Sequence, residues 1–371
     1  MIPFVDLKTQ YKSIQHELDE AIRNVINDCA FIQGKYCKEF EENFARACES
    51  SFCVGCSNGT TALELALFAY GIGQGDEVIL PSHTFIATAE AVSNVGATPI
   101  FAEIENTTFT INPNDIEKRI TSKTKAILPV HVYGQVADMD SILEIAKKHN
   151  LAVIEDCAQA HLAEYKGHRV PVGETGCFSF FPGKNLGAYG DAGAVVTKNE
   201  KIAEKIREKL NHGRKKGEKY SHSSIGTNYR MDGLQGAILN TKLKHLPKWT
   251  ERRRQAAALY NKGIKNNERL KGHADIIPPI EADYGKHVYH LYVIRTPRRD
   301  ELMQKLKENE IECGVHYPIP LHLQKAYAFL GHKEGDFPVT EQAAKEILSL
   351  PICGNITDES IQKVLSIFSI H

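Results

Sequence analysis

Two ionisable residues each follow an apolar stretch of the sequence, and together they could do covalent chemistry. Lys184 comes shortly after the apolar run 178–181, and Asp156 ends the apolar run 151–156. Short apolar runs of this kind are typical of buried strands. A lysine amine at the end of a buried strand loses hydration, which lowers its pKa and makes it a nucleophile at neutral pH. The pair therefore predicts a Schiff-base lysine that works with a carboxylate, although most lysines are solvated surface groups.

An acidic residue upstream of a Schiff-base lysine is the arrangement that pyridoxal phosphate (PLP) needs. The carboxylate keeps the pyridine nitrogen protonated, so that the ring can accept electrons from a carbanion. Gln159 follows Asp156 by three positions and could bond the ring oxygen, and Ser179 could donate to the phosphate. Two plainer readings stay open, because Asp156 could be a helix N-cap and Ser179 a polar residue on a strand face.

Two segments that join a strand to a helix supply further candidates. In the first, Gly59 lets the backbone approach an anion, Thr60 adds a hydroxyl, and the first amides of the helix favour negative charge. Simple N-capping by Ser57 or Asn58 would explain this segment equally well. In the second, Phe85 could stack on a flat heterocycle, although an aromatic residue near a helix start is more often core.

Substrate contacts are expected from a long polar stretch and from a proline-rich loop. Residues 211–227 are rich in Gly, Ser, Lys and His and predict a loop, which is usually functional when it is this long. Arginine can bind a phosphate through two parallel hydrogen bonds, so the loop and Arg230, which follows it, could bind a diphosphate. A run of charged residues is, however, usually a solvated surface. The predicted substrate contacts are Lys219, Tyr220, Arg230, His316, Tyr317 and His322. No metal site is predicted, because no carboxylate or cysteine spacing supports one.

Strands and helices alternate along most of the chain. Apolar strands are predicted at 52–56, 76–80, 98–104, 126–132, 151–156, 176–181 and 192–197, with helices near 9–28, 36–48, 60–70, 84–95, 113–121, 138–149, 199–210 and 231–249. This alternation indicates an α/β fold whose mostly parallel seven-stranded sheet is covered on both faces. Ligands of such sheets bind beyond the carboxyl ends of the strands, where the candidate residues should converge.

The alternation of strands and helices changes after residue 249, which predicts two domains. Residues 1–249 form the large domain, and residues 250–371 form a smaller α+β domain with a strand at 290–294 and helices near 299–309, 340–348 and 357–367.

The formal net charge of -1 argues against nucleic-acid binding. The first residues lack the pattern of a signal peptide, and no apolar stretch is long enough to cross a bilayer. The nine scattered cysteines are typical of reduced thiols, which predicts a cytoplasmic protein.

The segments 155–161, 179–187 and 228–231 together resemble the DegT/DnrJ/EryC1/StrS family of PLP-dependent nucleotide-sugar aminotransferases, and the match runs from Pro3 to Pro351. The resemblance implies a fold-type-I aminotransferase that works as a homodimer with active sites at the subunit interface. It implies that Lys184 forms the Schiff base, Asp156 meets the ring nitrogen, Phe85 stacks on the ring, Gln159 bonds the ring oxygen, Gly59, Thr60 and Ser179 hold the phosphate, and Asn228 comes from the other subunit.

The finer likeness is to members that aminate C3 of dTDP-linked 3-keto-6-deoxyhexoses in deoxyamino-sugar biosynthesis. The resemblance implies L-glutamate as amino donor and pyridoxamine phosphate as the carrier between half-reactions. UDP-linked 3-keto sugars and 4-keto sugars stay open as alternatives. Some relatives carry His in place of the Schiff-base lysine and act as dehydratases, which Lys184 disfavours. A regulatory sensor ranks last, because the whole catalytic set is present.

Overall fold

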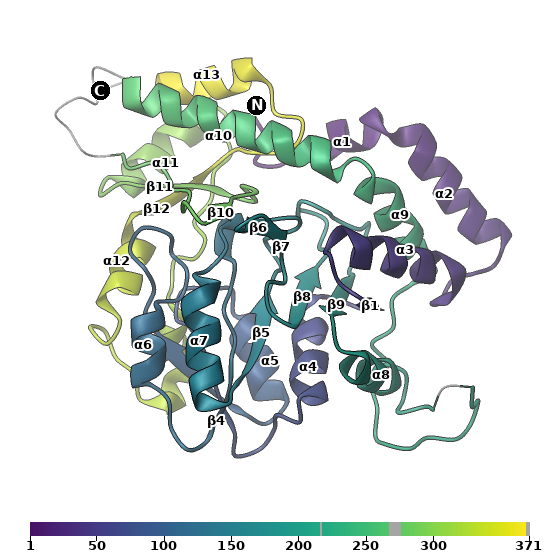
Figure 1. The fold of residues 1–371 in the computed structure, drawn as a ribbon. Helices are drawn as coiled ribbons and strands as arrows, with labels where there is room; N and C mark the ends of the chain where they lie inside the picture. The colour runs from purple at the N-terminus through teal and green to yellow at the C-terminus, as the bar shows by residue number, and fades with distance from the viewer. Residues whose placement is uncertain (216, 267–275, 369–371) are drawn as a thin grey trace.

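The computed structural model describes residues 1–215, 217–266 and 276–368. A central sheet lies between helices, and a smaller layer of helices and strands caps one end (Figure 1). Within the residues that the structure describes, no helix is long and apolar enough to cross a membrane.

The central sheet has seven strands in the order β1-β9-β8-β5-β4-β2-β3. Its strands are β1 (Phe52–Cys56), β2 (Glu77–Pro81), β3 (Thr98–Ala102), β4 (Thr124–Ile127), β5 (Ala152–Asp156), β8 (Thr175–Ser179) and β9 (Gly193–Thr197). All neighbours pair in parallel except that β9 runs antiparallel to both β1 and β8. The prediction of a mostly parallel seven-stranded sheet is therefore confirmed.

Helices cover both faces of this sheet with apolar side chains. One face packs against α4 (Gly59–Ala69), α5 (Ala87–Asn94) and α8 (Glu200–Lys209), and the other against α3 (Gly34–Ala47), α6 (Pro113–Lys118) and α7 (Met139–His149). Strands buried on both faces read as continuous apolar runs, which is why the sequence reveals them so clearly. The short β6 (Glu164–Tyr165), β7 (His168–Arg169) and β10 (Gly285–Lys286) form a separate three-stranded sheet.

Two helices differ from their predicted extents. The single helix expected at 9–28 is two helices, α1 (Leu7–Ser13) and α2 (Gln15–Asn27), because the backbone leaves the helical region at Ile14. The Ile14 side chain is buried in a small cluster with Leu18, Ile238 and Trp249, so packing outweighs helix periodicity there. The helix expected to run to residue 249 ends earlier, as α9 (Gly233–Leu243).

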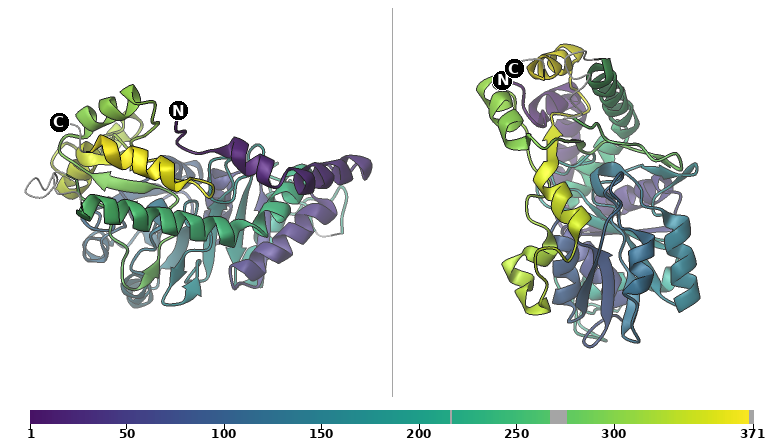
Figure 2. Two further views of the ribbon diagram at one scale, coloured as in Figure 1. Left: turned by 90° about the horizontal axis from the view of Figure 1, so that it is seen from above. Right: turned by 90° about the vertical axis from the view of Figure 1, so that its left-hand side faces the viewer.

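The next helix, α10 (Leu246–Asn266), passes through the predicted domain boundary at residue 249 and leads into the C-terminal part (Figure 2). There β11 (Tyr292–Arg295) and β12 (Ile347–Leu350) pair antiparallel, beside α11 (Arg299–Glu308), α12 (Pro338–Glu346) and α13 (Asp358–Ile367). Residues 347 and 348 were expected in a helix, but the apolar run 347–350 is a fully buried strand. The division into domains 1–249 and 250–371 stays a prediction.

Candidate active site

Lys184 lies on the loop that joins β8 to β9. The strand ends at Ser179, so the lysine stands beyond the strand rather than at its last residue. Backbone bonds from the Lys184 amide to the Phe181 carbonyl (2.8 Å) and from the Ala188 amide to the Phe180 carbonyl (2.7 Å) make the loop compact. Desolvation by the surrounding protein lowers the pKa of the Lys184 amine to about 8, while the charge of Asp156 opposes that shift. The amine is therefore a nucleophile near neutral pH.

Asp156 is the last residue of β5, and its carboxylate is held in place from two sides. One oxygen accepts from the Thr88 hydroxyl at 2.9 Å, and the other accepts from the Ala158 amide at 3.0 Å. Burial raises the pKa of Asp156, and these two bonds and the Lys184 charge oppose the rise. Turns rather than a helix follow Asp156, so the plain N-cap reading is wrong. A fixed, buried carboxylate of this kind suits a cationic ring nitrogen as partner.

Gln159 is oriented by Tyr133, to which the sequence assigned no role. The Tyr133 amide donates to Oε1 of Gln159 at 2.5 Å, so the Gln159 amide group turns its NH₂ outward, where it donates to the Tyr317 hydroxyl at 3.1 Å. Tyr133 has a positive φ of 61°, which is strained for a residue with a side chain. Its hydroxyl bonds the His316 carbonyl and lies 2.6 Å from Nε2 of His83. Tyr133 thus ties the Gln159 turn to the loop that carries Tyr317.

The turn after β1 forms an anion cradle at the start of α4. Asn58 caps the helix by accepting from the Thr61 amide at 2.9 Å, which leaves the preceding amides of Gly59 and Thr60 for a ligand. Gly59 packs directly against Ser179, since a Cβ built on Gly59 would lie 2.6 Å from the Ser179 Cβ. The N-capping reading is therefore confirmed for Asn58, and it leaves the cradle possible, which stays a prediction.

Phe85 and Tyr317 form the aromatic side of the site. Phe85 precedes α5 and is 54% exposed, so it is not a core residue. Its ring centroid lies 5.6 Å from that of Tyr317. Burial, followed by the charge of Asp156, raises the pKa of the Tyr317 hydroxyl, so this group stays protonated and can donate. An exposed phenyl face beside polar groups suits a flat heterocycle.

The two histidines of the proline-rich loop have different surroundings. His316 bonds the Ser349 hydroxyl at 2.8 Å, and burial and the charge of Lys184 lower its pKa to about 4. His322 is buried, with Nδ1 at 2.6 Å from the Ser82 hydroxyl and Nε2 at 3.0 Å from Glu341. Because both nitrogens of His322 are engaged within the chain, we propose that it anchors the loop, in place of the substrate contact expected from the sequence.

Two other predicted residues, Lys219 and Tyr220, belong to an arm between α8 and α9 that extends away from the body of the molecule (Figure 1). Both are exposed, and Tyr220 is 83% exposed. Asn228 is also exposed but lies at the base of the arm, where its backbone pairs with Asn211 and the next residue, Tyr229, accepts from the Ser57 amide at 2.9 Å. The backbone of Arg230 pairs with Cys56 at the end of β1, and its guanidinium donates to Asn211 at 3.3 Å.

One group of potential metal ligands occurs among the described residues, formed by His131, Glu155 and Cys157. The imidazole of His131 bonds Glu155 at 2.8 Å through Nε2 and accepts from the Ala137 amide at 3.2 Å through Nδ1. Glu155 also accepts from the Gly173 amide at 2.6 Å. The polar atoms of this pair are used by the protein itself, so we interpret the group as structural.

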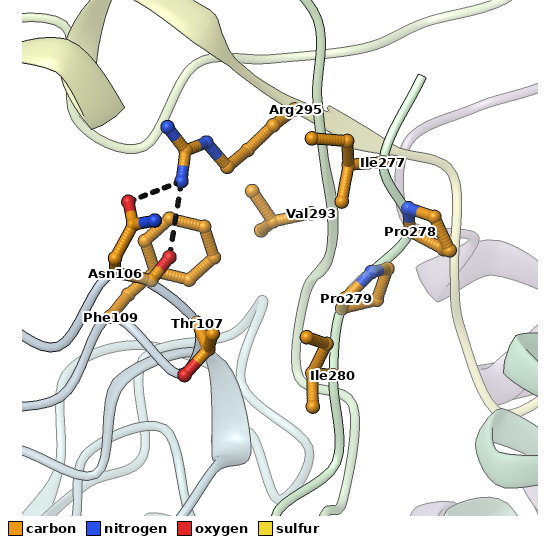
Figure 3. Close-up of a pocket in the computed structure, with 9 residues that line it drawn as sticks. All are labelled: Asn106, Thr107, Phe109, Ile277, Pro278, Pro279, Ile280, Val293 and Arg295. Carbon is orange, nitrogen blue, oxygen red and sulfur yellow. Dashed lines mark hydrogen bonds between the residues drawn. The ribbon is translucent and has the colours of Figure 1, made fainter. Parts of the chain in front are cut away.

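A shallow hollow of about 100 Å³ opens elsewhere, between residues 106–109 and 277–280 (Figure 3). Its walls are mainly apolar, and its one charged group, Arg295, already bonds Asn106 at 2.6 Å and Glu346 at 2.6 Å. It has neither a nucleophile nor a free anion-binding group in its lining. The candidate site residues lie instead at or just beyond the carboxyl ends of β1, β5 and β8.

The chain is similar to known proteins over nearly its whole length. The model of the DegT/DnrJ/EryC1/StrS aminotransferase family matches residues 12–369. The chain is 46% identical to the "Pleiotropic regulatory protein" of Geobacillus stearothermophilus, over 98% of this chain and 96% of that protein. It is 45% identical to dTDP-3-amino-3,6-dideoxy-alpha-D-galactopyranose transaminase of Aneurinibacillus thermoaerophilus, over 98% of each.

Among solved structures, the chain resembles S. venezuelae DesV in complex with a ketimine intermediate. The TM-score is 0.95 at 44% sequence identity, covering 99% of this chain and 97% of DesV. The likeness in sequence and fold extends over nearly the whole length, and the protein belongs to the DegT/DnrJ/EryC1/StrS aminotransferase family.

Proposed function

We propose that the protein is a PLP-dependent aminotransferase that moves an amino group from L-glutamate to a nucleotide-linked keto sugar. One observation carries the assignment to this site. A lysine amine whose pKa is about 8, a fixed buried carboxylate and an anion cradle meet where parallel strands end. This combination matches the three chemical groups of PLP, which are an aldehyde, a ring nitrogen and a phosphate.

The side chains present fit the cofactor group by group. Gly59, Thr60 and Ser179 would hold the phosphate, because the helix start supplies amides and two hydroxyls lie beside them. Asp156 would face the ring nitrogen, and the outward NH₂ of Gln159 would donate to the ring oxygen. The exposed ring of Phe85 would stack on the pyridine.

PLP, when bound, would supply an aldehyde that forms a Schiff base with an amine, and a ring that acts as an electron sink. The protein's own part is the proton transfer, which we assign to Lys184. Its Nζ takes a proton from the α-carbon of the amino donor and returns it at the reacting carbon, as general base and then general acid. A pKa of about 8 suits both roles, because the amine exists in both protonation states near neutral pH.

Glycine at position 59 should be required for tight cofactor binding. Gly59→Ala places a methyl group 2.6 Å from the Ser179 Cβ, so the turn must shift away from the phosphate position. We expect the Kd for PLP to rise about 10- to 100-fold, the cost of typical overpacking. Gly73→Ala is the matched control, because its Cβ would meet its nearest neighbour at 3.5 Å. Equal PLP affinity in wild type and Gly59→Ala would contradict the cradle.

For the sugar we propose a dTDP-linked 3-keto-6-deoxyhexose, which leaves as the 3-amino-3,6-dideoxyhexose. The support is the resemblance of the sequence to C3-aminating members and the name of the A. thermoaerophilus relative. UDP-linked 3-keto and 4-keto sugars are the alternatives. The cytoplasmic location stays a prediction.

We also propose a homodimer with shared active sites. The arm between α8 and α9 carries Asn228 and exposes two large apolar side chains, Tyr220 at 83% and Ile225 at 90%. Apolar side chains this exposed are characteristic of contact surfaces when they cluster. In a dimer the arm would bring Asn228, Lys219 and Tyr220 to the partner's phosphate cradle and substrate.

The absorption spectrum of the PLP-loaded protein tests the proposal. We expect a Schiff-base band that disappears with L-glutamate and returns when dTDP-3-keto-6-deoxyhexose is added, with a product mass that shows the new amine. Loss without return would redirect the substrate to UDP-linked or 4-keto sugars. A keto-deoxy product without amine transfer would instead support a dehydratase. Absence of the band would overturn the cofactor assignment.

A further inference from the structure

A second lysine, on α9, is buried more completely than Lys184. Lys242 lies on α9 and has no exposed surface. Its Nζ donates to the Gly187 carbonyl at 2.7 Å and lies 4.3 Å from the centroid of the Tyr189 ring. Burial lowers the pKa of Lys242 to about 8. A buried amine is costly unless it is well bonded, so its two contacts require an explanation.

A second side chain of α9 reaches the same segment. Gln235 precedes Lys242 by seven positions, so two helical turns place both on one face of α9. The Tyr189 amide donates to Oε1 of Gln235 at 2.9 Å, and Nε2 of Gln235 donates to the Tyr189 carbonyl at 3.2 Å. The helix therefore holds residues 187–189 through two side chains, one cationic and one amide.

The segment held in this way is the outgoing half of the loop that carries Lys184. Its two halves are in direct contact, because a Cβ built on Gly187 would lie 2.2 Å from the Pro182 carbonyl oxygen. The Ala188 amide also bonds the Phe180 carbonyl at 2.7 Å. A displacement of Gly187 or Tyr189 is thus passed on to Lys184, which lies between these contacts.

We propose that Lys242 and Gln235 are positioning residues that fix the Lys184 loop from α9 and so set the place of the reacting amine. The inference rests on the role proposed above for Lys184. It assigns to α9 a part in the reaction although neither side chain touches substrate or cofactor.

Lys242→Met in the holoenzyme is the central test. Methionine keeps the apolar length of the side chain and removes the donor to Gly187. We expect kcat to fall about 10- to 100-fold, the effect of a small misplacement of a reacting group, with KM for both substrates unchanged. Lys244→Met is the matched control, because Lys244 is an exposed residue at the end of the same helix and its loss should leave kcat unchanged.

Hydrogen–deuterium exchange of the full-length chain gives a readout that does not depend on activity. We expect faster exchange of the Tyr189 amide in Lys242→Met, and in Gln235→Met, which removes its acceptor directly. Unchanged exchange in both variants would overturn the proposal that Lys242 and Gln235 fix this loop. If Lys242→Met fails to fold, Gln235→Met tests whether α9 holds the same loop segment through its other side chain.

Amine rescue separates positioning of Lys184 from a general structural effect. A Lys184→Ala protein supplied with methylamine uses a free amine that no loop positions. Adding Lys242→Met should leave that rescued rate unchanged, and an equal loss there would refute the inference. The Schiff-base absorption band of the wild type tests the role of Lys184 separately. The exchange experiment tests whether Lys242 and Gln235 fix the loop, even if that band is absent.

Discussion

Lys184→Ala is expected to abolish turnover, with kcat reduced by at least about 10⁴-fold, because the variant loses both the Schiff-base amine and the general acid–base group. Borohydride reduction followed by peptide mass analysis provides the direct measurement. In the wild type the cofactor mass should stay attached to the peptide that contains Lys184, and in Lys184→Ala no peptide should carry it.

The control for this variant is Lys123→Ala, which removes an exposed lysine in the turn before β4. It should keep wild-type kcat and the cofactor label. Labelling of a different lysine in the wild type, or a Lys184→Ala protein that transfers amine without an added amine, would show that another residue is the nucleophile.

Asp156→Asn should lower kcat about 10²- to 10³-fold, a loss typical of removing one fixed charge that stabilises a developing charge. Asparagine has the same shape and can still accept a hydrogen bond from Thr88 or from the Ala158 amide. The neutral amide does not favour a protonated ring nitrogen, so the electron sink is weakened while the Schiff base to Lys184 can still form. We therefore expect normal borohydride labelling together with slow turnover.

Asp140→Asn serves as the comparison, because Asp140 is an exposed residue that pairs only with the exposed Lys166 in the described structure. Its kcat should not change. If Asp156→Asn turned over at the wild-type rate, the carboxylate would have no electronic role and the orientation of the ring in the site would need to be reversed. If it lost the label as well, Asp156 would instead be required for binding.

The parts of the site that could be predicted from the sequence are those at strand ends. Asp156 ends one buried apolar run and Gly59 comes three residues after another, and such runs can be recognised because both faces of the sheet are covered. Phe85 and Ser179 were found for the same reason. Each of these residues was found from its place in a short segment, and such a local pattern can be recognised in one sequence without knowledge of the tertiary contacts.

The residues whose roles were not predicted act through partners that are distant in the chain. Tyr133 meets Gln159 and His316, and Lys242 meets Gly187, so their importance depends on tertiary contacts that no local pattern records. Lysines are usually solvated surface residues, so the residue type at position 242 gave no reason to expect burial. His322 shows the opposite case, since a histidine in a functional-looking loop is fully used by its neighbours.

The reversed direction of β9 has a consequence for how the chain folds. β8 and β9 are neighbours joined by one loop, so they can pair as a local hairpin, with Ser179 at the end where the loop begins. β1 lies at the edge of the sheet, and its one partner among the described strands is β9, although the two strands are far apart in sequence. Contacts between distant segments form slowly, because the intervening chain must first be closed into a loop. Gly59 and Ser179 come together only once β1 has paired with β9. The rate at which a refolding chain binds the cofactor would therefore report the rate of this long-range pairing. Bound cofactor would also stabilise the paired strand by mass action.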